Sequence, residues 1–450
     1  MSSRAECTID AQRLLAHLHD DLPTPTHYWV GFSGGVDSTV LLHLIAQIRA
    51  SLPAPVSAIH IDHGLQAESA NWSQHCARTA ERCGIPYHSL RVDARPSAGE
   101  SPEAAARAAR YAAIADAIED DAMLLTAHHL DDQAETLLLQ LLRGAGVEGL
   151  AAMPACRRWH NRWHARPLLA LRRRTLHAWA VEKRLHWIED PSNAIDVADR
   201  NYLRNRVMPM LGARWPAAAD NIARSAELCA DAAETILGVA EADLATAQSD
   251  DGALRLSMLR ELPKARARKL LRVWLRGHAL PSLSLTRLDE ALSQLCDARS
   301  DADVTIECGD RAIRRFRGKA YVVAQHRLDL PGEPFDWQGD EVVLPAGLGV
   351  LRRVAAPGGI SRQMWDSGRV QVGFRHADVR CRPAGREGTR SFKKLAQSFD
   401  IPPWERERIP ILLIGGEVAA LAGYCVCEPF AAAEDEQGWQ LEWIAERIKE

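Results

Sequence analysis

The sequence predicts an α/β fold that begins with a Rossmann-like parallel sheet covered by helices on both faces. Two observations indicate this class. Short apolar segments alternate with helical patterns through the first third of the 450-residue chain, and this order is typical of a parallel sheet. A glycine-rich loop and two other polar motifs each follow one of the apolar segments. Ligands bind at that carboxyl edge in such folds.

The predicted elements of this domain alternate regularly. Strands are expected at 28–32, 56–61, 87–92 and 123–127, with 166–169 as a candidate fifth strand. Helices are expected between and after them, at 39–50, 69–83, 102–118, 130–142 and 171–185.

The length of the chain exceeds what one hydrophobic core usually supports, so two to four domains are expected. We place the sheet domain at 1–215 and a mainly helical middle domain at 216–330, where Ala-rich helical patterns cover 217–247 and 254–278. Strand patterns dominate after 332, which predicts a small α+β domain at 345–445.

Composition narrows the class of protein. No apolar segment reaches the roughly 18 residues that a membrane helix needs, and no secretory signal follows Met1, so we expect a cytoplasmic protein without membrane contact. The ten cysteines are scattered without a C-x-x-C pair. This pattern favours free thiols over disulfides or a zinc site, although Cys425 and Cys427 would share one face of a strand.

The formal net charge of −4 conceals two basic regions. We count thirteen Arg and Lys against five Asp and Glu over 151–216, and nine against five over 371–414. Separate positive regions on an acidic protein favour a polyanionic partner such as a nucleic acid. Solvated helix faces are the alternative.

The motif Ser33-Gly34-Gly35-Val36-Asp37-Ser38 is the glycine-rich loop. Free N–H groups at a helix start bind anions, and glycine allows a phosphate to approach the backbone closely. A Walker A loop would end in Gly-Lys-Ser/Thr, but this loop carries an acid, Asp37. An acid beside phosphates requires a divalent cation, so we predict a phosphate-bearing ligand and Mg²⁺ here. An ordinary strand–helix turn is the alternative.

Asp131 and Asp132 open a predicted helix after a strand. Helix capping is one interpretation, because acids in a first turn are favoured by the helix dipole. In the functional interpretation, Asp132 or Asp37 binds Mg²⁺ and the other carboxylate takes part in proton transfer. Glu135 lies on the same helix face as Asp131, four residues later.

Two further clusters are candidates for substrate contact. Glu103, Arg107 and Arg110 share one face of an Ala-rich helix, which suits either a surface salt-bridge ladder or a substrate-facing stripe. His60, Asp62 and His63 end a predicted strand. They suit phosphate or adenine contact better than zinc, with a packed, hydrogen-bonded His as an equal alternative.

The segment 190–206 gathers planar donors and one aromatic ring, which can grip phosphates or hold a splayed base. Its candidate substrate contacts are Asn201, Arg204 and Arg206. A polar interdomain linker with structural salt bridges is the alternative.

The loop resembles the signature of PP-loop ATP pyrophosphatases. Its combination with 130–136, 166–169, 190–206 and a tail of Lys393-Lys394-Leu395, 401–404 and 408–410 resembles the bacterial tRNA(Ile)-lysidine synthase family. That resemblance implies that ATP adenylates the C2 oxygen of the wobble cytidine in the CAU anticodon of tRNA(Ile). L-lysine then displaces AMP to give lysidine, which changes codon reading from AUG to AUA and tRNA identity from Met to Ile.

The resemblance also implies roles. Attack by an amine of pKa about 10.4 needs a carboxylate to hold the ammonium and help remove its proton. Asp131 and Asp132 are both candidates, with Glu135 in support. The alternatives are a PP-loop tRNA thiolase, which generally needs catalytic or cluster-binding cysteines, and a non-catalytic RNA-binding protein regulated by ATP. The oligomeric state stays open, with a homodimer among the options.

Overall fold

The structure is a computed structural model that describes residues 9–62, 69–92, 102–191, 195–299, 302–325, 328–377, 379–433 and 435–444. The chain forms two compact units, Met1–Val239 and Ala240–Glu450, which are described separately. The predicted site residue His63 lies outside the described residues.

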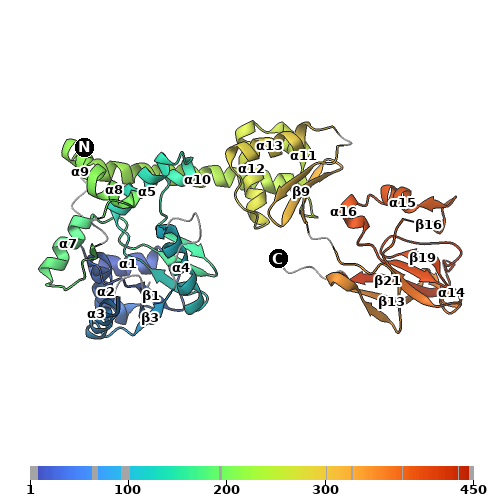
Figure 1. Ribbon diagram of the computed structural model, residues 1–450, viewed down its shortest axis with the longest axis horizontal. Helices are drawn as coiled ribbons and strands as arrows, with labels where there is room; N and C mark the ends of the chain where they lie inside the picture. The colour runs from blue at the N-terminus through green and yellow to red at the C-terminus, as the bar shows by residue number, and fades with distance from the viewer. Residues whose placement is uncertain are drawn as a thin grey trace. The chain divides into compact units, whose positions relative to one another are not determined.

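The first unit is built on a six-stranded sheet with the order β3-β2-β1-β4-β6-β5 (Figure 1). All neighbouring strands are parallel except the antiparallel pair β5–β6. The predicted α/β class is therefore confirmed. The strands are β1 (Tyr28–Gly31), β2 (Val56–Asp62), β3 (Tyr87–Arg91), β4 (Met123–Leu125), β5 (Cys156–Trp159) and β6 (Arg162–Ala165).

β1 lies at the centre of this sheet, where the strand order changes direction. Val30 pairs with Ala58 of β2 on one side and with Leu125 of β4 on the other. Both faces of β1 are covered, which explains why its sequence is continuously apolar. A crevice at the carboxyl ends of β1 and β4 is the expected ligand site of an open α/β sheet.

Helices cover both faces of the sheet. One hydrophobic core packs one face of the sheet against helix residues such as Leu18, Leu41, Ala80 and Leu176. A second hydrophobic core packs the other face of the sheet against Ile114. These two cores explain the apolar faces of the predicted helices. The helices are α1 (Ala11–Asp20), α2 (Val36–Ile48), α3 (Ser69–Arg82), α4 (Pro102–Ala117), α5 (Leu130–Leu142), α6 (Val147–Leu150) and α7 (Arg173–Glu182).

The candidate fifth strand at 166–169 is wrong. These residues form the turn that follows β6. Pro167 has no N–H to donate to a sheet ladder, and Leu168 instead turns into the core with 1% of its surface exposed. The β5–β6 hairpin that precedes this turn was not predicted.

A helical segment closes the first unit and leads into the second. It consists of α8 (Asp199–Tyr202), a π-helical stretch η3 (Leu203–Val207) and α9 (Met208–Arg214). Stretches of π-helix are rare and are often found at functional sites. The long helix α10 (Ala218–Ala247) follows.

The second unit begins with a helical layer on a four-stranded sheet of order β7-β10-β9-β8. Residues 254–278 are not one helix as expected, because Leu254–Arg255 joins the sheet and Pro263 begins a new helix. Strand β9 was also not predicted. The elements are α11 (Leu256–Glu261), α12 (Lys264–Gly277), α13 (Leu285–Asp297), β7 (Leu254–Arg255), β8 (Thr305–Cys308), β9 (Arg311–Phe316) and β10 (Lys319–Ala324).

The rest of the second unit is mainly strand and has its own cores. A five-stranded sheet has the order β11-β15-β18-β19-β20, in which β18 and β19 are consecutive antiparallel strands. The strands are β11 (Phe335–Asp336), β15 (Val370–Gly373), β18 (Ile411–Ile414), β19 (Glu417–Leu421) and β20 (Cys425–Val426).

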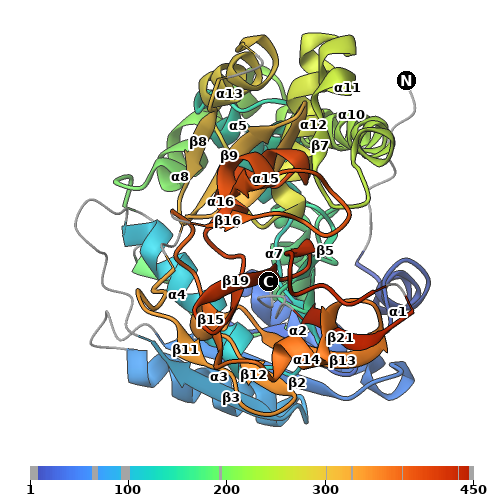
Figure 2. The same ribbon diagram turned by 90° about the vertical axis from the view of Figure 1, so that its right-hand side faces the viewer.

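A four-stranded sheet, a two-stranded sheet and three short helices complete this part of the chain. Strands β13 and β21 lie side by side in the four-stranded sheet, as Figure 2 shows. The elements are β12 (Glu341–Val343), β13 (Val350–Pro357), β14 (Ile360–Ser361), β21 (Gln437–Ile444), β16 (Arg380–Cys381), β17 (Arg390–Ser391), α14 (Arg362–Trp365), α15 (Phe392–Ser398) and α16 (Pro403–Arg406).

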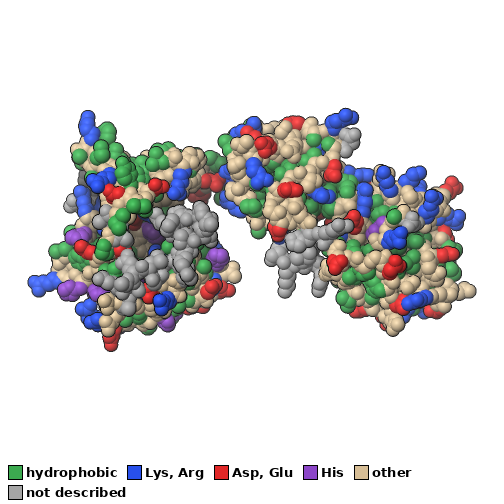
Figure 3. Space-filling model, in the orientation of Figure 1, with side chains coloured by type: hydrophobic (Ala, Val, Ile, Leu, Met, Phe, Trp, Pro, Cys, Tyr) green, Lys and Arg blue, Asp and Glu red, His purple; other side chains and the backbone are tan. Residues whose placement is uncertain are grey.

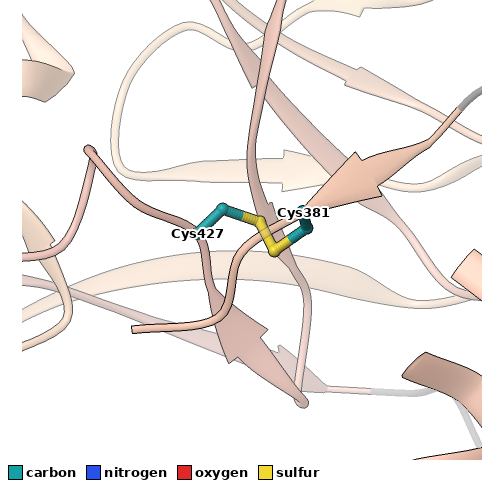
Figure 4. The surroundings of a disulfide bond; sticks show 2 residues. All are labelled: Cys381 and Cys427. Carbon is teal, nitrogen blue, oxygen red and sulfur yellow. A yellow bond between two sulfur atoms is a disulfide. The ribbon is translucent and has the colours of Figure 1, made fainter. Parts of the chain in front are cut away.

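The expectation that all cysteines are free thiols is wrong for two of them. Cys381 and Cys427 form a disulfide with a Cα–Cα distance of 5.4 Å (Figure 4). They are 46 residues apart in sequence, and no short motif could have paired them. The fold brings them together because Pro383, just after β16, bridges to Cys427. The sulfur of Cys425 lies within 4.8 Å of both.

In the part of the chain that the structure describes, no helix is both long enough and apolar enough to span a bilayer.

Candidate functional site

The glycine-rich loop lies between β1 and α2, as predicted. Gly35 is the N-cap of α2 and has no side chain to occupy the first-turn N–H groups. The hydroxyl of Ser38 donates to the Gly35 carbonyl at 3.0 Å, and the hydroxyl of Thr39 donates to the same carbonyl at 2.9 Å. Ser33 and Ser38 hydroxyls lie 3.0 Å apart. These bonds fix the loop at the start of α2, and N–H groups at a helix start can bind an anion.

Gly34 adopts a backbone conformation that side chains rarely tolerate, with φ of +84°. A Cβ on Gly34 would lie 2.9 Å from the Cys76 sulfur and 3.0 Å from Cδ1 of Ile188. The Gly34 carbonyl accepts a hydrogen bond of 2.9 Å from the Ile188 N–H. This position therefore requires glycine for both its backbone conformation and its close packing.

Asp37 lies in the first turn of α2, and one of its carboxylate oxygens accepts no hydrogen bond from the described residues. Its Oδ1 is buried and has no hydrogen-bond partner among the described residues. Its Oδ2 lies 3.7 Å from Nε2 of His129 and 3.9 Å from Nε of Arg173. Burial raises the pKa of Asp37, and the nearby His129 and Arg173 only partly offset that effect. A buried anionic oxygen without a partner is costly unless a ligand or cation satisfies it.

A cavity of about 450 Å³ opens beside this loop. One part of its wall is apolar and another part carries charged groups. It is lined by Gly31, Phe32, Ser33, Gly35, Asp37, Ser38, Ile59, Ile61, Ala106, Arg107, Arg110, Tyr111, Ile114, Leu124, Thr126, Ala127, His128, Asp132, Arg200 and Arg204. The loop, the helix α4, the segment after β4 and the helical segment 199–207 therefore share one site.

Asp132 has a capping role as well as a place in the cavity wall. It forms a capping box with His129, in which Asp132 Oδ2 accepts from the His129 N–H at 3.0 Å and the Asp132 N–H donates to His129 Nδ1 at 3.2 Å. The capping interpretation is thus correct for Asp132. It does not exclude a role in binding or catalysis, because Asp132 Oδ1 has other partners.

Those partners are two arginines, which also bind Glu135. Arg200 Nη2 lies 3.1 Å and Arg204 Nη2 lies 2.8 Å from Asp132 Oδ1. Arg200 Nε donates to Glu135 at 3.0 Å and Arg204 Nε donates at 2.7 Å. Burial works to raise the pKa of Asp132, but His129 and Arg200 outweigh it and the net pKa is lowered. We call these four side chains the acid–arginine cluster.

Asp131 faces away from this cluster. Its carboxylate accepts from Arg172 Nη1 at 3.2 Å and from the Arg173 N–H at 2.7 Å, and Arg172 also binds Asp220 of α10 at 2.5 Å. Asp131 is not among the residues that line the cavity. Its present contacts tie α5 to α7 and α10.

The predicted stripe on α4 partly enters the cavity. Arg107 and Arg110 line it, and the Arg107 guanidinium lies 5.2 Å from the centre of the Tyr111 ring. Burial lowers the pKa of Arg110. The residue Glu103 lies in α4, but its side chain is outside the described residues.

Three other predicted residues have local contacts and do not line the cavity. Asn201 donates to the Ile195 carbonyl at 2.9 Å, and Arg206 pairs with Asp196 at 2.7 Å. His60 is buried and shares a hydrogen bond of 2.8 Å with the Phe32 carbonyl, which agrees with the packed-histidine alternative.

Several cavity residues were not selected from the sequence. Arg200 was missed although it lies four residues before Arg204, a spacing that places both on one helix face. His128, Tyr111 and Thr126 were missed as contact residues because they give no signal until the fold brings α4 and the end of β4 together.

Comparison with known proteins agrees with this architecture. The PP-loop domain family matches residues 7–211, the TilS substrate binding domain matches 254–321 and the TilS substrate C-terminal domain matches 370–443. A tRNA(Ile)-lysidine synthase of Methylococcus capsulatus is 41% identical over 428 residues, which cover 92% of this chain and 96% of that protein. This chain belongs to the tRNA(Ile)-lysidine synthase family.

Other members of the tRNA(Ile)-lysidine synthase family are similarly close. The protein of Coxiella burnetii is 37% identical over 97% of both chains, and that of Alkalilimnicola ehrlichii is 41% identical over 90% of this chain and 91% of its own. The match thus extends over both compact units.

Proposed function

We propose that this protein is a tRNA(Ile)-lysidine synthase. ATP adenylates the C2 oxygen of the wobble cytidine in the CAU anticodon, and L-lysine then displaces AMP to form lysidine. The modified tRNA(Ile) reads AUA rather than AUG and accepts Ile rather than Met. We place the formation of lysidine in the cytoplasm. One observation carries the proposal: a single cavity joins the glycine-rich loop to Asp132, Arg200 and Arg204 of the acid–arginine cluster. Family membership supports it.

The loop side of the cavity suits the adenylation half-reaction. A carbonyl oxygen is a poor leaving group, and transfer of AMP from ATP converts it into a good one while pyrophosphate leaves. The N–H groups at the start of α2 would hold the phosphates. Arg107 and Arg110 on the facing helix would offset the phosphate charge.

The residues present fit a magnesium ion at Asp37. Its buried Oδ1 has no partner among the described residues, and Mg²⁺ prefers carboxylate and phosphate oxygens. When bound, Mg²⁺ would neutralise charge on the departing pyrophosphate. Asp132 is less suited, because both its oxygens already accept hydrogen bonds. We therefore propose Asp37 as the principal ligand.

The acid–arginine cluster suits the lysine half-reaction. Only about 0.04% of an amine with pKa about 10.4 is unprotonated at pH 7, so the site must bind the ammonium and take up its proton. We propose that the ammonium exchanges with a guanidinium at Asp132 and Glu135. Asp132 then assists proton removal, the amine nitrogen bonds to C2, and the bond from C2 to the AMP-bearing oxygen breaks. Asp131 would support the helix arrangement rather than catalyse.

The basic surface of the second unit suits the RNA. Figure 3 shows Lys and Arg side chains gathered over the part of the C-terminal region that holds α15 and β16. Phosphate contacts from such a surface would give salt-dependent binding. Exposed members of this basic surface include Arg375, Arg380, Arg382, Arg386, Lys393 and Lys394.

Nucleoside mass spectrometry tests the proposal directly. The protein is incubated with tRNA(Ile) transcript, ATP, Mg²⁺ and isotopically labelled L-lysine. We expect a labelled lysidine nucleoside and AMP in equal amounts. The absence of a lysine-dependent mass shift would overturn the proposal, and sulfur in the product would instead support the thiolase. An Asp132→Asn variant that still modified tRNA at the wild-type rate would remove Asp132 from the chemistry.

A further inference from the structure

A chain of buried polar side chains ends at the wall of the cavity. Arg166 Nη2 lies 3.3 Å from His164 Nδ1, and His164 Nε2 lies 2.9 Å from the hydroxyl of Thr126. The same hydroxyl lies 2.8 Å from Nδ1 of His128, which lines the cavity. His164 is 0% and Arg166 is 2% exposed. None of these contacts is used by the mechanism proposed above.

The direction of hydrogen bonding in this chain is fixed by its first member. A guanidinium can only donate, so His164 Nδ1 must accept and the proton of neutral His164 must be on Nε2. That proton is donated to Thr126, and His128 Nδ1 is the remaining partner of the Thr126 hydroxyl among the described residues, so the Thr126 O–H donates to it. The proton of neutral His128 is consequently on Nε2, the ring nitrogen that the chain leaves for a ligand.

Both imidazoles are held in the neutral form by their surroundings. Burial lowers the pKa of His164 to about 2, with Arg166 adding to the effect. Burial lowers the pKa of His128 to about 3 despite the opposing charge of Asp132. Each ring thus carries one proton under ordinary conditions, as the chain of donors requires.

We propose that His128 is a specificity-determining residue that donates a hydrogen bond from Nε2 to an uncharged acceptor atom of a nucleobase. The hydrogen bonds of this network make His128 Nε2 a donor that carries no charge. Such a group favours a carbonyl oxygen or ring nitrogen and disfavours an amino group. Thr126, His164 and Arg166 are positioning residues, because they act through His128.

The surrounding wall supports a base rather than a phosphate or the lysine ammonium. Ile61, Leu124 and Tyr111 form an apolar part of the lining, which suits the face of a planar ring. Charged ligand groups already have partners in the arginines and carboxylates of the same cavity. Two bases could present the acceptor: the adenine of ATP and the wobble cytosine of the RNA. The second source rests on the proposed function, and the first does not.

Histidine nitrogen chemical shifts test the tautomer without any turnover. In protein labelled with ¹⁵N-histidine, we expect His128 and His164 to show a protonated Nε2 and an unprotonated Nδ1 near pH 7. In Thr126→Val, His128 should lose this single tautomer. Thr79→Val is the matched control, because Thr79 is also buried but lies outside the cavity. A protonated Nδ1 on His128 in the wild-type protein would overturn the proposal.

Binding and kinetics then identify the base. His128→Leu removes the donor, whereas His128→Gln keeps an N–H near the position of Nε2. We expect His128→Leu to weaken the binding of one substrate by roughly 10- to 100-fold. His128→Gln should restore most of that binding. If His128→Leu binds ATP more weakly at equilibrium, the acceptor of the His128 hydrogen bond is the adenine. If ATP binding is unchanged and the KM for tRNA is raised, the acceptor is the wobble cytosine.

Two results would overturn the assignment to a base. One is a His128→Leu protein that folds, as judged by its melting temperature, and keeps wild-type constants for ATP and tRNA. The other is a change confined to the KM for lysine. Failure of lysidine formation in the wild-type protein would contradict the proposed function, while ATP binding and the tautomers would still test His128.

Discussion

Arg204 binds Glu135 at two points. Its Nε lies 2.7 Å from Oε1 and its Nη2 donates to Oε2 at 2.8 Å. The Glu135 side chain is only 3% exposed, so water and salt screen this pair weakly. Arg200 adds a second guanidinium to the same carboxylate. Removing one partner from a buried pair of this kind leaves uncompensated charge behind.

We therefore expect Glu135→Gln to reduce the free energy of unfolding by about 3–5 kcal/mol. Urea denaturation measures this change. Glu241→Gln on the exposed surface of α10 is the control and should stay within about 0.5 kcal/mol of wild type. Equal midpoints for the two variants would show that Glu135 does not stabilise the domain.

Asp37→Asn should separate stability from activity. Burial raises the pKa of Asp37 and its Oδ1 has no partner among the described residues, so its negative charge destabilises the metal-free fold. We expect the neutral variant to be about 0.5–1 kcal/mol more stable at pH 7 in EDTA. Its adenylation rate should fall on the order of 100-fold or more. A variant that is less stable and fully active would contradict both expectations.

Gly34→Ala should damage the phosphate loop. The positive φ and the contacts of the added Cβ with Cys76 and Ile188 predict a loss of about 1–3 kcal/mol in stability. ATP affinity should fall with it, because the loop must shift. Gly212→Ala is the control: no atom lies within 4 Å of its added Cβ. Calorimetric titration with ATP would show equal affinities if Gly34 were an ordinary turn residue.

His164 should make the fold sensitive to mild acid. Its pKa is about 2 in the folded protein and about 6.5 when unfolded, so only the unfolded chain takes up a proton between these values. Stability is complete above pH 6.5 and falls as pH decreases, by up to about 1.4 kcal/mol per pH unit for this group. His164→Gln should flatten the slope between pH 6 and 4, while exposed His19→Gln should not. Urea midpoints at several pH values measure both slopes.

The exposed basic residues of the C-terminal region should contribute to RNA affinity. Arg386→Ala, Lys393→Ala and Lys394→Ala should each weaken tRNA binding and reduce the slope of log K against log salt by roughly 0.7–0.9. ATP binding should be unchanged. Arg352→Ala is the matched control, because Arg352 is already paired with Glu341. An unaltered salt dependence in all three variants would exclude this surface from RNA binding.

The sequence was sufficient to predict the sheet and the loop, because both depend on local patterns. Apolar periodicity located β1, β2 and β4, and a glycine-rich motif directly after β1 placed the loop at the carboxyl edge. The helix start at Leu130 was also predictable from its two acids. These features are encoded within a few adjacent residues.

The rest depended on tertiary contacts. Local pattern could not separate Asp131 from Asp132, since both carboxylates lie in the same first turn and only their arginine partners distinguish them. The pairing of Cys381 with Cys427 likewise depends on the strand arrangement. The segment 166–169 was predicted as a strand because it contains apolar residues. In the structure Leu168 is buried from within a turn and not from a strand.

The contribution of 199–207 to the cavity has a consequence for protein synthesis. A nascent chain that has emerged only as far as α5 already contains the loop, Asp37 and both acids of the cluster, but not Arg200 or Arg204. The two acids then lack the guanidinium partners that they have in the folded protein. Assembly of the acid–arginine cluster therefore waits for the last helices of the first unit, which complete the cavity wall.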